Sequence, residues 1–115
     1  MRHYKFLVFT KPVNGREQEY DDWYQNIHLR DLVTVPGFKS AQRFRLKKTY
    51  QKPLNGDEPF DHMAIYDIET DNLDGVLAGM KRLSGKVVIS DALDLPASSA
   101  VFYEEYGAVV SSPDP

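Results

Sequence analysis

The chain has 115 residues, 42% of them hydrophobic and 12% aromatic, so it is long enough to form one domain with its own core. Its formal net charge of −3 and its lack of a long basic run argue against nucleic acid as a partner. The sequence contains no cysteine, which excludes disulfides, thiol catalysis and cysteine-ligated metal sites.

The first predicted element is a strand from His3 to Thr10, because this run alternates and is rich in residues that favour β structure. Its apolar part is too short for a signal sequence or a membrane span. We therefore expect a cytoplasmic protein with no membrane partner. Pro12 and the turn pair Asn14-Gly15 then end the strand.

From Arg16 to about Val33, aromatic and apolar residues recur every three or four positions, which indicates one helix. Acidic residues crowd its first half, where the partial positive charge of a helix N-terminus favours them. The pair Pro36-Gly37 ends the helix. The residues expected on its buried face are Tyr20, Trp23, Tyr24, Ile27, Asp31 and Leu32, with His28 at the edge of this arc.

Two strands flanking a polar hairpin loop are predicted next. The first covers residues 38–48 and has one basic side. Arg43 or Arg45 on this side could bind a ligand carboxylate, but we favour an ion pair with Glu104 or Glu105 across the sheet or a dimer interface. The loop covers residues 49–61 and contains the turn pair Asn55-Gly56. The second strand runs from His62 to Glu69.

A second helix is predicted to begin after the cap candidates Thr70, Asp71 and Asn72 and to end at Gly85. Its glycines at positions 75 and 79 are expected to allow close packing on the sheet. Residues 86–96 are ambiguous between a short extra turn and an arm. The last strand is expected from about residue 97 to residue 109.

The resulting order of elements, β-α-β-β-α-β, predicts an α+β fold of the ferredoxin-like type. In this sandwich a four-stranded antiparallel sheet carries both helices on one face. Several strands place apolar groups on both sides, so the bare face is expected to meet a second copy of the chain. We therefore predict one dimeric α+β barrel domain over residues 1–110 and a flexible C-terminal tail over residues 111–115.

His28 and Asp31 are the strongest candidates for a reaction centre. At a spacing of i and i+3 they can touch, and a neighbouring carboxylate would favour the protonated imidazole and orient it. His28 would then be a general acid or base in a pocket lined by aromatic rings. The alternative is a histidine at a helix end, where a cation is favourable, with Asp31 capping the chain. Both interpretations stay open at this point.

The remaining candidates lie on the predicted strands. Tyr66 and Tyr103 could present hydroxyl groups to an oxyanion, although such residues are more often core rings with a polar tip. His3 and His62 begin their strands and are expected to be half-exposed edge residues. The three histidines do not follow a metal-ligand spacing, so we expect no metal site.

The segment from Glu19 to Leu46, EYDDWYQNIHLRDLVTVPGFKSAQRFRL, resembles the EthD-like branch of the dimeric α+β barrel superfamily. In that branch an aromatic-rich helix carries a histidine and then an acidic residue, and Pro-Gly-Phe leads into the second strand. Arg30 stands where many relatives have proline, and Ile27 where a glutamate often precedes the histidine. The matching residues are Trp23, Tyr24, Asn26, His28, Asp31, Pro36, Gly37 and Phe38.

The resemblance implies a homodimer with a small-molecule cavity between the helices and the sheet of each subunit. Superfamily members include polyketide cyclases, muconolactone isomerases, cofactor-free monooxygenases, haem-degrading enzymes and accessory proteins, so the fold does not determine the function. What they share is chemistry on apolar, often aromatic or carbonyl-bearing molecules.

Our preferred hypothesis is an enzyme of lyase, isomerase or cyclase type that needs no cofactor and acts on a small aromatic or enolisable metabolite in a catabolic or secondary-metabolic pathway. His28 would transfer a proton, and Asp31 would orient it. Tyr66 or Tyr103 would hydrogen-bond the developing oxyanion. Two alternatives are a non-catalytic dimeric binding or accessory protein, and a haem-binding or monooxygenase relative with His28 as an axial ligand. The predicted substrate-binding residues are Phe6, Tyr20, Trp23, Tyr24 and Phe44.

Overall fold

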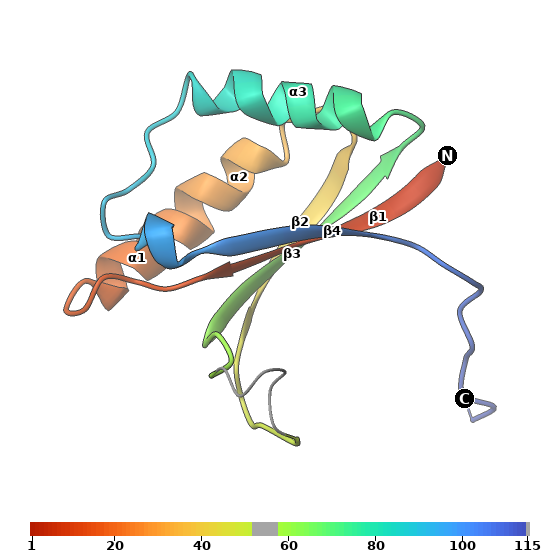
Figure 1. Ribbon diagram of the computed structural model, residues 1–115, viewed down its shortest axis with the longest axis horizontal. Helices are drawn as coiled ribbons and strands as arrows, with labels where there is room; N and C mark the ends of the chain where they lie inside the picture. The colour runs from red at the N-terminus through yellow and green to blue at the C-terminus, as the bar shows by residue number, and fades with distance from the viewer. Residues whose placement is uncertain (52–57, 115) are drawn as a thin grey trace.

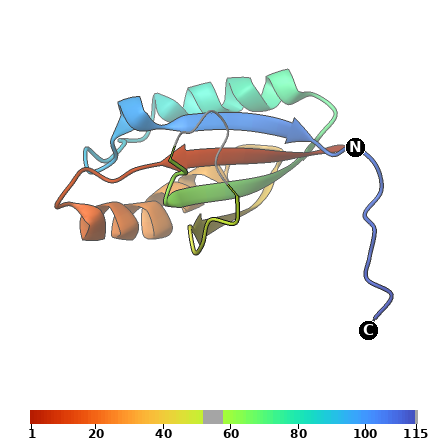
Figure 2. The ribbon, with the colours of Figure 1, turned by 60° about the horizontal axis from the view of Figure 1, so that its bottom comes forward.

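The computed structural model describes residues 1–51 and 58–114, so residues 52–57 of the predicted hairpin loop, with its turn pair Asn55-Gly56, lie outside the described residues. Two layers make up the fold, a sheet and a set of helices packed on one of its faces (Figures 1 and 2). In chain order the elements are β1 (Arg2–Thr10), α1 (Glu17–Trp23), the π-helix η1 (Tyr24–His28), α2 (Leu29–Leu32), β2 (Phe38–Arg45), β3 (His62–Thr70), α3 (Leu73–Ser84), the 3₁₀-helix η3 (Leu95–Ala97) and β4 (Ser99–Glu104).

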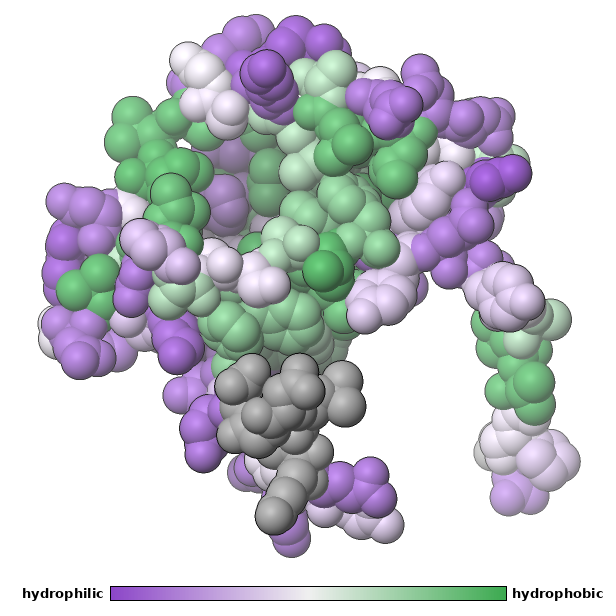
Figure 3. Space-filling view, viewed as in Figure 1, coloured by the Kyte–Doolittle hydropathy of each residue, from purple (hydrophilic) through white to green (hydrophobic). Residues whose placement is uncertain are grey.

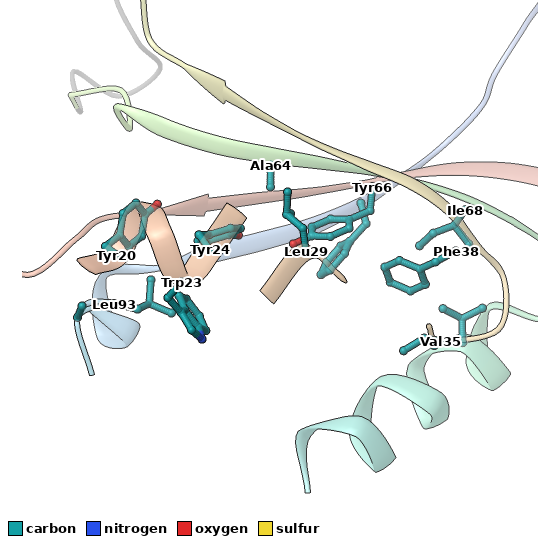
Figure 4. Packing of buried hydrophobic residues seen from close by; sticks show 13 residues of the cluster. Tyr20, Trp23, Tyr24, Leu29, Val35, Phe38, Ala64, Tyr66, Ile68 and Leu93 are labelled. Atoms are coloured by element: carbon teal, nitrogen blue, oxygen red, sulfur yellow. The ribbon is translucent and has the colours of Figure 1, made fainter. Parts of the chain in front are cut away.

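The four strands lie in the order β2-β3-β1-β4, and every neighbouring pair is antiparallel. With the helices on one face, this is the ferredoxin-like sandwich, and the predicted fold class is confirmed. Alternate strand residues face the helices and form the core, as shown in Figure 4. The core consists of Phe6, Tyr20, Trp23, Tyr24, Leu29, Val35, Phe38, Ala64, Tyr66, Ile68, Val76, Ala92 and Leu93.

One continuous helix runs from Glu17 to Leu32, as the periodicity predicted, but its middle turn is a π-helix. The backbone N–H of Leu29 donates to the carbonyl of Tyr24, five residues back. This wider turn rotates the following residues relative to a regular α-helix. Ile27, predicted in the core, is therefore 52% exposed, and Leu29 is buried in its place.

A β-bulge near the start of β2 changes which residues face the core. Phe38 pairs with Ile68, but the next aligned pair is Ser40 with Asp67, so one extra residue lies in β2. Phe38 is buried under the helices, whereas Phe44 faces the opposite side of the sheet. Regular alternation from Phe38 would place both phenylalanines on one face.

Helix α3 begins where the cap residues predicted, because the Asn72 side chain accepts a hydrogen bond from the Gly75 N–H at 3.1 Å. The glycine at position 79 does not pack on the sheet as expected. A Cβ there would lie 2.9 Å from Cγ1 of Val35, in the loop before β2. This glycine therefore lets α3 lie close to that loop.

Residues 86–94 form an irregular strap that leads from α3 across the helical layer toward β4 (Figure 1). Its far end is fixed by two hydrogen bonds to the loop after β1, Val13 N–H to Ala92 O at 2.7 Å and Asp94 N–H to Lys11 O at 2.9 Å. Arg16 also forms an ion pair with Asp91, with a distance of 2.6 Å. The sequence had left this segment undecided.

Strand β4 is shorter than predicted. It pairs with β1 only between Tyr4 and Phe9, and the chain leaves the sheet after the Glu105 N–H donates to the His3 carbonyl. Among the described residues, no helix is long and apolar enough to cross a membrane.

Candidate functional site

Two adjoining cavities lie between the helical layer, the strap and the β1–β4 side of the sheet. The first, which we call the α3 lobe, has a volume of about 220 Å³, and the second, the β4 lobe, about 280 Å³. Figure 3 shows this face of the molecule hollowed, with apolar side chains around the hollow. Val8, His28 and Ile89 line both lobes, and we call these three residues the waist.

The walls of the two lobes differ in polarity. The α3 lobe has a carboxylate at Asp31, which lies in the same lobe as the imidazole of His28. The β4 lobe has hydroxyl-bearing residues at Thr10, Ser98 and Ser99. Ser84 adds one hydroxyl-bearing residue to the α3 lobe. Most of the remaining lining is apolar, with Phe6, Leu32, Met80, Leu83 and Val87 in the α3 lobe and Leu93, Leu95 and Ala100 in the β4 lobe.

The ring of His28 is held by two aromatic neighbours. It stacks on the indole of Trp23, with centroids 4.5 Å apart and planes at 21°. The ring of Tyr24 meets it edge to face at 4.9 Å. These contacts fix the plane of the imidazole where it borders both lobes.

Burial lowers the pKa of His28 to about 4, and the negative charge of Asp31 opposes this effect more weakly. The imidazole is therefore neutral at neutral pH. The sequence-based expectation had the direction of the Asp31 effect right but missed that burial outweighs it. Within the described residues, no hydrogen bond joins the two side chains.

Three tyrosine hydroxyls lie in the core between the helix and the sheet. The hydroxyl of Tyr20 shares a hydrogen bond with that of Thr10. The hydroxyls of Tyr24 and Tyr66 are buried and have no hydrogen-bond partner among the described residues. In Figure 4 they point toward one another from η1 and β3. Burial raises the pKa of Tyr66 far above its usual range, so this hydroxyl stays neutral and keeps a proton that it can donate in a hydrogen bond.

Arg43 supports the aromatic side of the helix. Its Nη2 lies 2.6 Å from Oδ1 of Asp21, and its guanidinium lies 5.6 Å and 5.1 Å from the ring centroids of Tyr20 and Tyr24. Arg43 therefore pairs with Asp21, and the prediction that it pairs with Glu104 or Glu105 is wrong. Its partner lies on α1 because β2 presents this side chain to the helices.

The structure brings some of the predicted site residues together and separates others. His28, Asp31, Phe6 and Tyr24 line the lobes, while Tyr20, Trp23 and Tyr66 lie behind them in the core. Phe44 and Tyr103 lie on the opposite face of the sheet, where Phe44 pairs with Met63 and Tyr103 with Lys5. Tyr103 is 61% exposed there and cannot meet a ligand that contacts His28.

Sequence reasoning missed the residues that α3 and the strap contribute to the lobes. Met80 and Leu83 lie on the apolar face of α3, and helical spacing alone does not separate a residue that packs on the sheet from one that lines a cavity. Ile89 belongs to the apolar run Val87-Val88-Ile89, which carries no periodicity that would separate a lining residue from an exposed one.

No family model matches the sequence, and no curated protein matches it. Solved structures do share its fold. An EthD family protein from Bacillus halodurans has a TM-score of 0.61 and 19% identity, covering 92% of this chain and 100% of that chain. A MhuD variant with two manganese protoporphyrin IX molecules per active site has a TM-score of 0.55 and 12% identity, covering 95% of this chain and 98% of that one.

HapK from Hahella chejuensis has a TM-score of 0.53 and 13% identity, covering 97% of this chain and 99% of that chain. At these identities the likeness shows the fold alone. The presence of an EthD family protein among the neighbours agrees with the resemblance seen in residues 19–46.

Proposed function

We propose that the chain is an enzyme of lyase, isomerase or cyclase type, working without a cofactor, in which His28 takes a proton from a small aromatic or enolisable molecule. The observation that carries this proposal is the position of His28, whose uncharged, partly buried imidazole borders both lobes of an otherwise mostly apolar cleft. A neutral imidazole has a free lone pair and can accept a proton.

In the proposed step, a C–H or O–H bond of the ligand breaks and an N–H bond forms on His28. The electron pair stays on the ligand as an enolate or phenolate, and return of the proton to another atom completes an isomerisation. Asp31 would stabilise the imidazolium that forms, since its charge already acts to raise the pKa of His28. The step needs no further reactant.

The apolar lining supports a ligand of this class. Phe6 and Leu32 offer ring-sized apolar surface in the α3 lobe, and Tyr24 does so in the β4 lobe. We keep Tyr66 as a candidate donor to the developing oxyanion, because its neutral hydroxyl has no partner among the described residues. It lies behind the lobe walls, so it would act only if the ligand or Tyr24 moved toward it.

The experiment that tests this function is solvent-deuterium incorporation, followed by proton NMR over a panel of phenols, aryl ethers and β-dicarbonyl compounds. We expect exchange with the wild-type chain and a loss of roughly 100- to 10,000-fold with His28→Ala. His3→Ala is the matched control, because this histidine lies on β1 away from the two lobes. Exchange that survives in His28→Ala would reject the proposal.

One observation favours a second candidate, a binding or accessory protein without catalysis. A general base works best when its pKa lies near the working pH, and the pKa of His28 is lowered to about 4. In that case the NMR lines of the compounds would broaden on binding. Neither the wild type nor His28→Ala would exchange protons of the compounds for solvent deuterium.

A haem-binding protein would use the same neutral imidazole as an axial ligand. The residues fit this role less well, because a porphyrin is larger than either lobe and the imidazole is already stacked on Trp23. A Soret band after haem titration that is lost in His28→Ala would be needed to support it.

We also propose that the chain works as a homodimer, which is typical of this fold. The face of the sheet opposite the helices is apolar in its centre and is flanked by the ion pair of Lys5 with Asp67. A second copy offers the same surface and would cover it. The apolar residues of this open face are Leu7, Phe9, Phe44, Met63, Ile65 and Val101.

A further inference from the structure

We infer that the two lobes are one binding site for an elongated, hydroxyl-bearing aromatic ligand that crosses the waist, and that Ile89 determines how long a ligand the cleft accepts. This inference rests on the proposed ligand site and adds the shape and polarity of its ligand. It concerns the part of the cleft that the strap covers.

The spacing of residues along β1 places the two lobes side by side. Phe6 lines the α3 lobe, Val8 lines both lobes and Thr10 lines the β4 lobe. These are successive residues on one face of a strand, so each lies about 7 Å from the next. The lobes are therefore neighbours along β1, and a ligand that reaches into both crosses the wall at Val8, about 7 Å along the strand from Phe6 and from Thr10.

The volumes of the two lobes also favour a single binding site. Each lobe, at about 220 Å³ and 280 Å³, is smaller than the roughly 300–1,000 Å³ of sites that enclose drug-sized ligands. The two lobes joined fall inside that range. A single ring can occupy only one lobe, whereas two fused rings place their centre against the imidazole of His28.

Among the three waist residues, Ile89 has the side chain that can move or change in size most easily. It is 37% exposed, whereas its neighbour Val88 is 87% exposed and points to solvent. The strap forms backbone hydrogen bonds at Val87, Ser90 and Ala92, and within the described residues Ile89 forms none. Its side chain is therefore held by apolar contacts, and a change of its size need not displace the strap.

The polarity of the α3 lobe limits the chemistry of the ligand. The carboxylate of Asp31 borders the cavity and accepts no side-chain hydrogen bond among the described residues. A ligand hydroxyl or N–H would satisfy it, whereas a ligand carboxylate would be repelled. We therefore expect 2-naphthol to bind and 2-naphthoate to bind at least tenfold more weakly.

The test measures the dissociation constants of phenol and 2-naphthol by NMR titration of methyl groups. In the wild type, 2-naphthol should shift the methyl signals of both Leu83 and Leu93, one from each lobe, and bind at least tenfold tighter than phenol. Ile89→Trp should bring the two dissociation constants within about threefold of one another, because it narrows the waist. Val88→Trp is the matched control and should leave the tenfold ratio intact.

The inference is overturned if 2-naphthol shifts the methyls of only one lobe in the wild type, a result that needs no variant to fold. It is also overturned if Ile89→Trp, with unchanged signals elsewhere, keeps the wild-type ratio. His28-dependent deuterium exchange on phenol alongside either result would leave the proposed function standing. Binding across both lobes without any exchange would reject the enzyme and keep the inference.

Discussion

The imidazole of His28 stacks on the indole of Trp23, although His28 lies five positions after Trp23 in the chain. In a regular α-helix, residues five apart point about 140° away from each other. The π-helix from Tyr24 to His28 closes hydrogen bonds between residues five apart, which brings both rings to the same side. Trp23 therefore acts as a platform that fixes the imidazole at the cleft.

The lowered pKa of His28 predicts a pH dependence of stability. Unfolded histidine has a pKa of about 6.5, so between about pH 6.5 and pH 4 the unfolded chain takes up a proton that the folded chain does not. The free energy of unfolding should fall by up to about 3 kcal/mol as the pH drops through this window. Urea unfolding at pH 4, 5, 6 and 7 measures it.

Two variants separate this effect from other titrating groups. His28→Gln should lose most of the dependence of the unfolding free energy on pH between about pH 6.5 and pH 4. His62→Gln should keep most of it, because burial lowers the pKa of His62 less strongly. Equal slopes in the wild type and His28→Gln would show that the His28 imidazole is not buried as described.

The buried tyrosines predict two opposite outcomes of removing one hydroxyl. Tyr20→Phe leaves the buried hydroxyl of Thr10 without its partner and should cost about 1–3 kcal/mol of unfolding free energy. Tyr66→Phe removes a hydroxyl with no partner among the described residues and should change stability by less than about 0.5 kcal/mol. Thermal or urea unfolding would contradict this if Tyr66→Phe were the more costly change.

The variant Tyr66→Phe also tests the proposed role of Tyr66 as a hydrogen-bond donor to the oxyanion. If Tyr66 donates to the oxyanion, Tyr66→Phe should slow exchange while stability stays unchanged. Loss of stability and exchange together in Tyr66→Phe would instead indicate a purely structural role.

Hydrophobic periodicity predicted the order of strands and helices because it depends on which face each element buries. Two single-residue irregularities escaped it. The π turn exposed Ile27 and buried Leu29, and the bulge in β2 separated Phe38 from Phe44. Period-based reasoning assumes regular geometry. An inserted residue reverses the faces of the strand residues that follow it and rotates the helix residues that follow it.

The strap escaped prediction for another reason. Contacts with distant residues such as Val13 and Arg16 hold it in place, and local sequence carries no signal for them. The candidate base was identified from its aromatic helix, but the residues that complete the cleft, such as Ile89, were not.

Gly37 should be intolerant of substitution. Its φ is +101°, and an added Cβ would lie 2.9 Å from Cγ2 of Val76. Gly37→Ala should therefore cost more than the roughly 1 kcal/mol of left-handed strain alone. Gly15→Ala is the matched control, because its φ is +84° and nothing lies within 4 Å of the added Cβ. If urea unfolding showed equal losses of unfolding free energy in Gly37→Ala and Gly15→Ala, the close contact of Gly37 with Val76 on α3 would be contradicted.

The open face of the sheet predicts a homodimer in solution. Sedimentation should give twice the chain mass at micromolar concentration. Val101→Glu, which places a charge on that face at the edge strand β4, should give a monomer. Val88→Glu changes an exposed strap residue and should leave the dimer intact. A monomeric wild type would reject the assembly.

The central claim is that His28 works as a neutral base, and the pH profile of deuterium exchange tests it most directly. For the best compound of the panel, kcat/KM should stay level from pH 8 down to about 5 and then fall as the imidazole takes up a proton near pH 4. The fall should be absent from the residual exchange of His28→Ala. A wild-type rate that rises as the pH drops from 7 would show that the imidazolium acts as an acid, and the claim would be wrong.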